Sequence, residues 1–283
     1  MNTIADNELL EYIKEDLPYF DLTTHLQNSN NQKAKLEIFT REDIVVSCTE
    51  EAARIAQLLS CEVNFFVASK KSIKKDEVLI EIQGDYNNIH QAYKLLQVLL
   101  EYSCKIATTT YNMSKLIKNV NPTCELLTTR KSFPFAKKFC INSILNGGGM
   151  PHRLGLSESI LFFKQHRKLY SSNKDFYEQI SKFKNMAVEK KVVVESSDIE
   201  DIKQLMEYGV DVIQIDKGSV DLINQALELR KKCLYENIRI IAAGGINIKN
   251  AEAFAKTGVD AIVTSSLYNC GMADLGTRLE LIK

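Results

Sequence analysis

The stretch that decides the fold is residues 192–216, VVVESSDIEDIKQLMEYGVDVIQID. It predicts a buried strand at Val192–Glu195, a helix near residues 199–208 and a second strand at Val212–Asp216, because short apolar runs flank a helical pattern. Two strands joined by a helix form a βαβ unit, and such units build a parallel sheet. The stretch therefore predicts an α/β fold for this part of the chain.

The same alternation continues on both sides of this stretch. Further strands are predicted at Cys124–Thr128, Ser159–Phe162, Ile238–Ala242 and Ala261–Thr264. Further helices are predicted at 220–232 and 248–257. A barrel and a doubly wound sheet both fit this pattern. Polar and charged residues follow the C-terminal end of each strand, which favours a barrel, since its strand ends meet at one mouth. We therefore expect a barrel of about six strands.

The N-terminal part has a different rhythm, with strands followed by helices. Strands are predicted at 35–40, 44–47 and 77–82, and helices at 7–14, 50–59 and 88–117. This order is typical of an α+β unit. We expect two parts, because the chain of 283 residues exceeds the length of one ordinary domain.

Composition excludes several classes of protein. Lys plus Arg and Asp plus Glu are 36 each, so the formal net charge is zero, which argues against a dedicated nucleic-acid binder. No run approaches the roughly 20 apolar residues that cross a membrane, and the N-terminus does not read as a signal peptide. The seven cysteines have no CxxC spacing, which predicts free thiols in a reducing cytoplasm.

Two motifs carry positive charge. Arg130 and Lys131 follow a predicted strand within TTRKSFP, and Arg can hold a carboxylate or phosphate through two parallel hydrogen bonds. The alternative is a solvated basic loop. His152 and Arg153 follow three glycines at 147–149, which allow close approach of the backbone. The spacing is neither a Walker loop nor a dinucleotide-binding fingerprint.

Two further motifs suit carboxylate and phosphate chemistry. Glu195 and Asp216 each end a strand, so they could hold magnesium or ribose hydroxyls at one mouth, or be neutralised by neighbours such as Lys217. Gly244 and Gly245 come before a predicted helix, an arrangement that presents N–H groups to an anion. The alternative is that the two glycines only form a tight connection between the strand and the helix. Together the motifs indicate an enzyme acting on a phosphosugar, or a phosphate-binding module.

The order of these motifs resembles the nicotinate-nucleotide pyrophosphorylase (quinolinate phosphoribosyltransferase) family, and in particular its ModD branch, which is associated with molybdenum-transport loci. The resemblance runs from about Asp16 to the C-terminus. It rests on Asp21-Leu22-Thr23-Thr24, Ile106-Ala107-Thr108, Thr129-Arg130-Lys131-Ser132-Phe133-Pro134, Gly147-Gly148-Gly149 with His152-Arg153, Val194-Glu195-Ser196, Ile215-Asp216 and Gly244-Gly245-Ile246.

The resemblance implies an architecture. We expect an N-terminal α/β sandwich domain at 1–108, an open α/β barrel at 109–270, and a C-terminal tail at 271–283 that packs on the first domain. It also implies a homodimer in which Lys94 of one subunit reaches the site of the other.

The resemblance implies a reaction as well: a pentosyltransferase joins a nitrogen heterocycle to phosphoribosyl pyrophosphate (PRPP), with magnesium and no organic cofactor. Arg130, His152 and Arg153, with Lys94, would hold the acidic groups of the acceptor. Lys131, Glu195 and Asp216 would be catalytic, and the two carboxylates would also organise the metal. The residues implied to hold phosphate are Lys131, Ala243, Gly244, Gly245, Ser265 and Ser266.

The sequence departs from the family at several of these positions. Phe163 stands where the family has a second active-site lysine, and Lys164 where it has an acidic residue. Ala243 replaces a serine, and Ser265 and Phe135 replace glycines. A charge-assisted hydrogen bond lost in a closed site costs about 1.5–3 kcal/mol. We therefore expect an acceptor less acidic than quinolinate.

Three interpretations remain open at this point. The first is a ModD-type pyrophosphorylase with an unidentified acceptor. The second is an authentic quinolinate phosphoribosyltransferase of NAD biosynthesis, in which Lys164 replaces the missing cation. The third is a non-catalytic protein that retains the phosphoribosyl pocket. Turnover of quinolinate, and PRPP binding without turnover, separate them.

Overall fold

The computed structural model describes residues 4–27, 29 and 32–282, which divide into two units. The first unit combines 1–111, 133–148 and 268–283, and the second combines 112–132 and 149–267. The domain boundaries expected from the sequence, 1–108 and 109–270, stay a prediction. The units differ from them in that residues 133–148 group with the first unit.

The first unit contains an antiparallel sheet of four strands in the order β13-β1-β5-β3. Its strands are β1 (Lys33–Thr40), β3 (Glu62–Phe66), β5 (Val78–Asp85) and β13 (Leu275–Ile282), and a separate pair consists of β2 (Ile44–Val45) and β4 (Ser72–Ile73). Buried and more exposed residues alternate along β1, as the period of a half-buried strand requires. One face of the sheet is therefore buried in the core of this unit.

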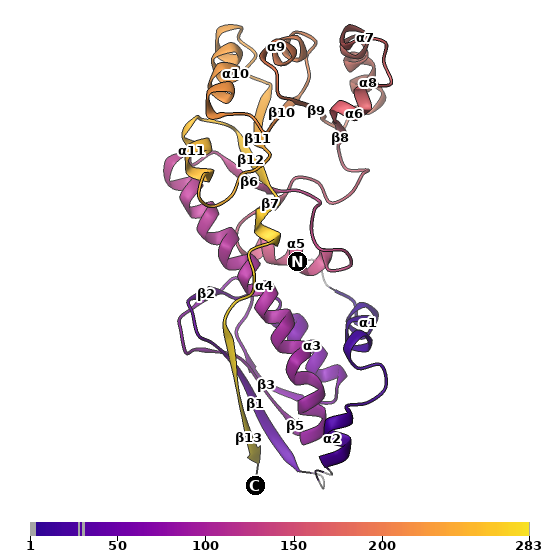
Figure 1. Cartoon of the computed structure of the whole chain (residues 1–283), viewed down its shortest axis with the longest axis vertical. Coiled ribbons are helices and arrows are strands. Elements are labelled where there is room, and N and C mark those ends of the chain that lie inside the picture. The colour runs from indigo at the N-terminus through magenta and orange to yellow at the C-terminus, as the bar shows by residue number, and fades with distance from the viewer. Residues whose placement is uncertain (1–3, 28, 30–31, 283) are drawn as a thin grey trace. The chain divides into compact units, whose positions relative to one another are not determined.

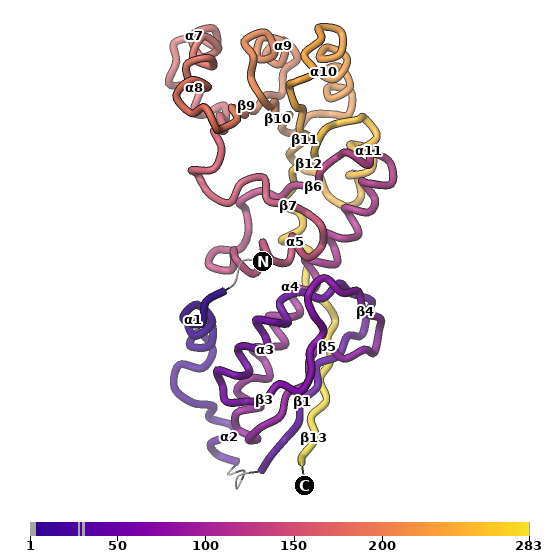
Figure 2. The backbone as a smooth tube through the Cα atoms, turned by 180° about the vertical axis from the view of Figure 1, so that it is seen from behind, coloured from indigo at the N-terminus to yellow at the C-terminus, as the bar shows by residue number. Residues whose placement is uncertain are grey.

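Helices cover that face. The helices of this unit are α1 (Asp6–Asp16), α2 (Leu22–Gln27), α3 (Thr49–Leu58), α5 (Lys137–Asn146) and part of α4 (Tyr86–Val120), and those that cover the sheet are α3 and α4 (Figure 1). Both backbone views place α3 and α4 on the same side of the strands (Figures 1 and 2). The opposite face carries charges instead, with Lys35 paired to Glu37 and Glu81 at 3.2 and 3.4 Å. This division explains the alternation in β1.

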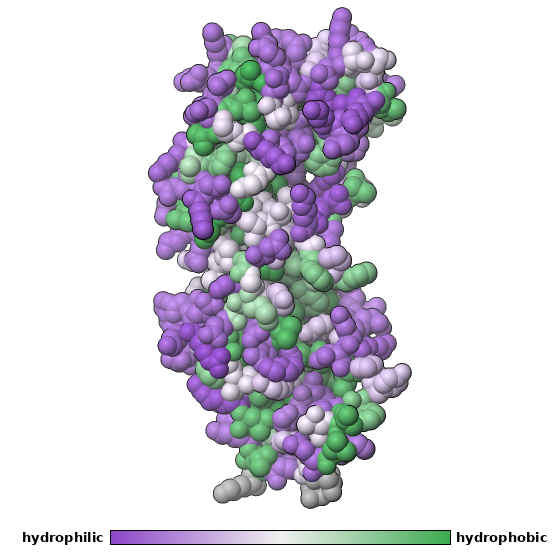
Figure 3. Space-filling view, in the orientation of Figure 1, coloured by the Kyte–Doolittle hydropathy of each residue, from purple (hydrophilic) through white to green (hydrophobic). Residues whose placement is uncertain are grey.

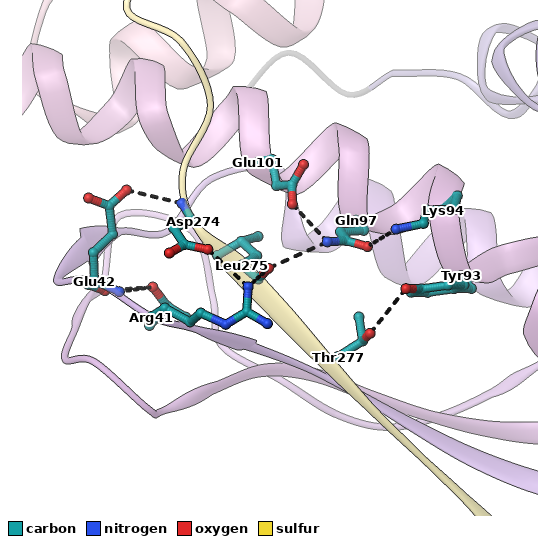
Figure 4. A network of polar contacts seen from close by, with 10 residues as sticks. Arg41, Glu42, Tyr93, Lys94, Gln97, Glu101, Asp274, Leu275 and Thr277 are labelled. Carbon is teal, nitrogen blue, oxygen red and sulfur yellow. Dashed lines mark hydrogen bonds and ion pairs between the residues drawn. The ribbon is translucent and has the colours of Figure 1, made fainter.

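The strand β13 was not predicted from the sequence. It pairs with β1 along its whole length, from Lys33 opposite Ile282 to Thr40 opposite Leu275. Figure 4 shows the polar contacts at its start: Arg41 Nη1 donates to Asp274 Oδ1 at 3.0 Å and to the Leu275 carbonyl at 3.1 Å. These contacts fix the point at which the tail enters the sheet.

The second unit contains a sheet of seven parallel strands in the order β7-β6-β12-β11-β10-β9-β8. Its strands are β6 (Glu125–Thr128), β7 (Met150–Pro151), β8 (Ile160–Phe162), β9 (Val192–Ser196), β10 (Val212–Asp216), β11 (Arg239–Ala243) and β12 (Ala261–Thr264). The six predicted strands are confirmed to within two residues. The seventh, β7, is two residues long and lies at one edge.

Helices connect most of these strands. They are α6 (Lys164–Arg167), α7 (Asn173–Glu178), α8 (Ile180–Met186), α9 (Ile199–Glu207), α10 (Val220–Lys232), α11 (Ala251–Lys256) and a 3-10 turn at Ser266–Tyr268. Residues after the two edge strands meet, since the Arg153 guanidinium lies 5.8 Å from the ring centre of Phe163. The sheet therefore curves into an open barrel, as expected.

Two further expectations concern the whole chain. Within the described residues, no helix is long and apolar enough to cross a membrane. None of the seven cysteines, all of which lie among the described residues, forms a disulfide, and five of them are buried.

Figure 3 shows hydrophobic side chains gathered near α2, where Leu22 and Leu26 are exposed.

Candidate functional site

A pocket of ≈ 580 Å³ lies in the second unit and is lined by the ends of its strands. The period of a strand decides which side chains line it. In β10, Gln214 and Asp216 line the pocket, whereas the alternate residues Ile213 and Ile215 do not. In β9 the inward residue is Glu195, which pairs in register with Gln214. Beneath the pocket lies an apolar cluster that includes Val193, Val212 and Ile241 in these strands.

One wall of the pocket carries carboxylates. Burial raises the pKa of Glu195, and the charge of Asp216 raises it further. A hydrogen bond from Gln214 Nε2 to Glu195 Oε2 at 3.2 Å and the charges of Lys131 and Lys217 act in the opposite direction but do not cancel the rise. The two carboxylates therefore interact, which is the arrangement that a cation or sugar hydroxyls would stabilise.

Another wall carries cations. Burial lowers the pKa of His152, and the charge of Arg153 lowers it further, so the imidazole is neutral at pH 7. Burial also lowers the pKa of Arg153, with a contribution from Arg130. Arg130, Lys131 and Arg153 all line the pocket. Three cations held together in this way favour an anionic ligand, which relieves their mutual repulsion.

The glycine turn after β11 is shaped by its neighbours. Gly244 and Gly245 have φ of +82° and +75°, in the left-handed region that favours glycine. A Cβ on Gly244 would lie 2.5 Å from the backbone nitrogen of Lys217 and 2.6 Å from Asp216 Oδ1. The turn therefore passes directly against the end of β10. The helix α11 (Ala251–Lys256) starts three residues after the predicted start at 248, so five residues separate it from Gly245.

The remaining wall is aromatic. Phe163 lines the pocket, and its ring stacks on that of His166 with centres 5.6 Å apart and an interplanar angle of 22°. The Phe163 backbone N–H donates to His166 Nδ1 at 3.0 Å, which fixes the imidazole. Arg153 lies over the Phe163 ring. An apolar ring thus lines the pocket beside Arg153, at the position where the family pattern has a lysine.

The structure brings together all of the predicted site residues except Lys94. Lys94 lies on α4 in the first unit, is exposed, and donates to Gln97 Oε1 at 2.8 Å (Figure 4). Gln214 and Asn247 also line the pocket and were missed by the sequence reasoning. The signal for Gln214 was present: it lies two residues before Asp216 in a strand, so both side chains face the same way.

Within the described residues, no three His, Cys, Asp or Glu side chains form a cluster that would hold a metal ion. Glu195 and Asp216 are nonetheless fit for magnesium, which is commonly bound by one or two carboxylates together with substrate phosphates. A metal at this wall would therefore depend on the substrate for its other ligands.

Comparisons with known proteins agree on one family. The family model described as quinolinate phosphoribosyl transferase, C-terminal domain, matches residues 106–275, and its N-terminal counterpart matches 21–104. A relative from Pasteurella multocida that carries the name pyrophosphorylase ModD is 31% identical over 276 residues, 98% of both chains. The protein of the same name from Escherichia coli O157:H7 is 29% identical and covers 94% of this chain and 93% of its own.

Relatives with another name are also similar. One is a protein of Methanothermobacter thermautotrophicus that carries the name nicotinate-nucleotide pyrophosphorylase (carboxylating). It is 27% identical, and the match covers 89% of this chain and 90% of the relative. Among solved structures, the nicotinate-nucleotide pyrophosphorylase from Francisella tularensis superposes with a TM-score of 0.88 at 21% identity, covering 99% of this chain and 98% of that one. At that identity, the likeness supports the fold.

Proposed function

Because the chain belongs to the quinolinate phosphoribosyltransferase family, whose members are pentosyltransferases, we propose that it transfers the phosphoribosyl group of PRPP to a nitrogen heterocycle less acidic than quinolinate. The observation that carries the proposal is the pocket that combines a glycine turn, two carboxylates and four cations with the aromatic ring of Phe163. The glycine turn, the carboxylates and part of the positive charge suit PRPP. The aromatic ring suits an acceptor with fewer carboxylates.

The reaction forms one bond and breaks another. The ring nitrogen of the heterocycle attacks C1 of the ribose, and the bond from C1 to the pyrophosphate oxygen breaks with its electron pair, so pyrophosphate leaves. Glu195 and Asp216 accept hydrogen bonds from the ribose hydroxyls. Lys131 supplies positive charge to the departing pyrophosphate, and such fixed charges lower the barrier because they are already oriented.

The phosphate and the acceptor are held by different walls. The backbone N–H groups of the turn at Gly244 and Gly245, together with Ser265 and Ser266, cradle the 5′-phosphate. Ala243, at the end of β11, supplies backbone to this cradle but no hydroxyl. These groups anchor PRPP at the mouth of the barrel, where the strand ends meet.

Arg130 and Arg153 hold an acidic group of the acceptor, and neutral His152 donates or accepts a hydrogen bond. Phe163 offers the acceptor a face to stack on. Stacking replaces the second charge contact that a dicarboxylate would require.

Magnesium fits the two carboxylates and would neutralise pyrophosphate when bound. The family as a whole is one of phosphoribosyltransferases, which generally use a divalent metal. We further propose that two copies of the chain associate, with Lys94 of the partner subunit adding a cation to the acceptor side. A reducing, cytoplasmic setting is consistent with the free thiols.

The first test is calorimetric titration with PRPP and magnesium. We expect the wild type to bind PRPP and the variants Lys131→Ala and Glu195→Ala to bind it weakly, because Lys131 supplies positive charge to the pyrophosphate and Glu195 accepts hydrogen bonds from the ribose hydroxyls. Failure of the wild type to bind PRPP would contradict the proposed family reaction. Binding without turnover of any heterocycle would favour a non-catalytic role.

The second test concerns the acceptor. Pyrophosphate release is followed with quinolinate and with monocarboxylates such as nicotinate. Phe163→Lys is expected to improve quinolinate use by about 10- to 150-fold, since it adds a charge-assisted contact. Phe163→Leu removes the ring without adding charge and is not expected to help quinolinate. A wild-type kcat/KM for quinolinate of about 10⁴ M⁻¹s⁻¹ or more would instead assign the chain to NAD biosynthesis.

A further inference from the structure

Gln214 is the polar residue of an otherwise apolar stretch of β10, and the proposed reaction gives it no role. Its side chain lines the pocket although the residue is only 6% exposed. Val212 and Ile213 before it and Ile215 after it are apolar and buried. A buried amide in such surroundings costs free energy unless its hydrogen-bonding groups find partners. Its presence therefore calls for an explanation.

The orientation of the amide is fixed by Glu195. Gln214 Nε2 donates to Glu195 Oε2 at 3.2 Å, and the two residues are register partners on β10 and β9. Rotating the amide by 180° would place its carbonyl oxygen against a carboxylate oxygen, and both are acceptors. The nitrogen therefore points to Glu195.

The carbonyl oxygen is left without a partner. Gln214 Oε1 is buried and accepts no hydrogen bond from any residue that the structure describes. The carboxylates of Glu195 and Asp216, which line the same wall of the pocket, are hydrogen-bond acceptors when ionised. A ligand that brings an N–H or O–H group to this oxygen would satisfy it. A ligand that brings a carboxylate or carbonyl oxygen would be repelled.

Two groups of the proposed substrates could supply that donor: a ribose hydroxyl held by Glu195, or an N–H or O–H group of the heterocycle. Gln214 lies two residues before Asp216, and therefore one side-chain layer below the mouth where the glycine turn lies. The pocket is also lined by the apolar side chains of Leu161 and Val263, whereas Ile241, the register partner of Gln214 on β11, is not among the lining residues. Apolar walls suit the faces of a planar ring better than a sugar whose hydroxyls all need partners.

We propose that Gln214 is a specificity-determining residue of the acceptor subsite: its Oε1 accepts a hydrogen bond from an N–H or O–H group on the edge of the heterocycle and disfavours an oxygen acceptor at that position. This inference rests on the proposed function. It extends that function by selecting the ring edge, whereas Phe163 acts on the ring face.

The test uses nucleoside 5′-monophosphates, which combine the ribose phosphate with different rings. Three matched pairs differ by an amino group against an oxygen: adenosine and inosine 5′-phosphate, cytidine and uridine 5′-phosphate, and nicotinamide and nicotinate mononucleotide. Dissociation constants are measured by calorimetry for these six and for PRPP. The proteins are wild type, Gln214→Met, Gln214→Glu and Ile241→Val.

We expect the wild type to prefer the amino member in at least one pair. Gln214→Met, which keeps the length of the side chain without the acceptor, is expected to reduce that preference by about tenfold. Gln214→Glu retains an acceptor oxygen and is expected to retain the preference. Ile241→Val changes the same layer of the barrel without removing a polar atom, so it is expected to leave the ratio unchanged.

Two results would overturn the inference. One is that Gln214→Met leaves the ratio unchanged in all three pairs. The other is that it weakens PRPP and every nucleotide equally, since a uniform loss would mean that Gln214 acts only by positioning Glu195. By contrast, wild-type protein that binds neither PRPP nor any nucleotide would refute the proposed function itself. Urea unfolding of each variant confirms that the fold is retained.

Discussion

Replacement of Gly244 by alanine tests how tightly the glycine turn is packed against β10. Gly244 and its neighbour Gly245 both have positive φ, at +82° and +75°. They differ in the space around them. A Cβ on Gly244 would lie 2.5 Å from the backbone nitrogen of Lys217, whereas a Cβ on Gly245 would meet no atom within 4 Å. Gly245→Ala is therefore a matched control.

The expected losses of stability have two causes: the left-handed backbone and the lack of space for a Cβ atom. An L-residue in the left-handed region costs roughly 1–2 kcal/mol, and both variants incur that cost. Gly244→Ala adds an overpacking cost of about 1–3 kcal/mol, because the nearest atom, the backbone nitrogen of Lys217, cannot rotate away. We therefore expect the free energy of unfolding to fall by about 2–5 kcal/mol for Gly244→Ala and by about 1–2 kcal/mol for Gly245→Ala.

The assay is urea unfolding of the three proteins, with linear extrapolation to zero denaturant. Calorimetric titration with PRPP is run in parallel. Because the added methyl group would also lie 2.6 Å from Asp216 Oδ1, Gly244→Ala is expected to weaken PRPP binding as well. Equal losses of stability in the two variants would refute the reasoning, since they would show that β10 yields to the turn at no cost.

Three further predictions concern buried charges. Arg167→Met is expected to lower the free energy of unfolding by about 3–5 kcal/mol, because Asp201, which Arg167 contacts at 2.6 and 2.7 Å, would lose its buried cation; Arg167→Met/Asp201→Leu should recover most of the loss in urea unfolding, and a single variant as stable as wild type would contradict this. Burial raises the pKa of Asp201, but hydrogen bonds from Arg167, Ser196 and Tyr177 outweigh burial and hold the pKa below its ordinary 3.8. The resulting stability is present above pH 3.8 and is expected to disappear as the pH falls through the pKa of the folded protein. Unfolding measured between about pH 2 and 5 should therefore show a smaller loss of stability in Asp201→Asn than in the wild type. Burial raises the pKa of Glu51 above 4.5, with a further contribution from Glu50, so stability is full below pH 4.5 and falls as the pH rises through the folded value; Glu51→Gln is expected to flatten this fall, and parallel curves for the two proteins would disprove it.

Much of the second unit could be predicted because its signals are local. The buried run at Val212–Asp216 gives the strand, and the charged residue at its end gives the site, since parallel strands end at one mouth. Gln214 could have been found by the same period of two. It lies in the interior of the strand, where a polar residue is not marked by a strand end.

The first unit was harder to predict because part of it is not local. Leu275–Ile282 has no turn or partner strand nearby in sequence, and its pairing with β1 is decided by tertiary contacts. The helix α5 was missed because Lys137–Asn146 lies between two motifs that drew attention to loops. Phe135, which replaces a family glycine, retains the left-handed backbone expected of one, with φ of +65°. There the sequence alone could not show whether the turn had changed.

The pairing of β13 with β1 has a consequence for how the protein is made. Arg41 and Leu275, which meet at the start of this pair, are 234 positions apart. At about 5–20 residues per second, a ribosome needs roughly 10–50 s to synthesise that interval. Throughout that time one side of β1 has no partner strand, and an open strand edge can pair with other chains. The unit whose residues are synthesised first is thus the last to be completed, and its newly made edge is the part of the nascent chain that a chaperone would have to shield.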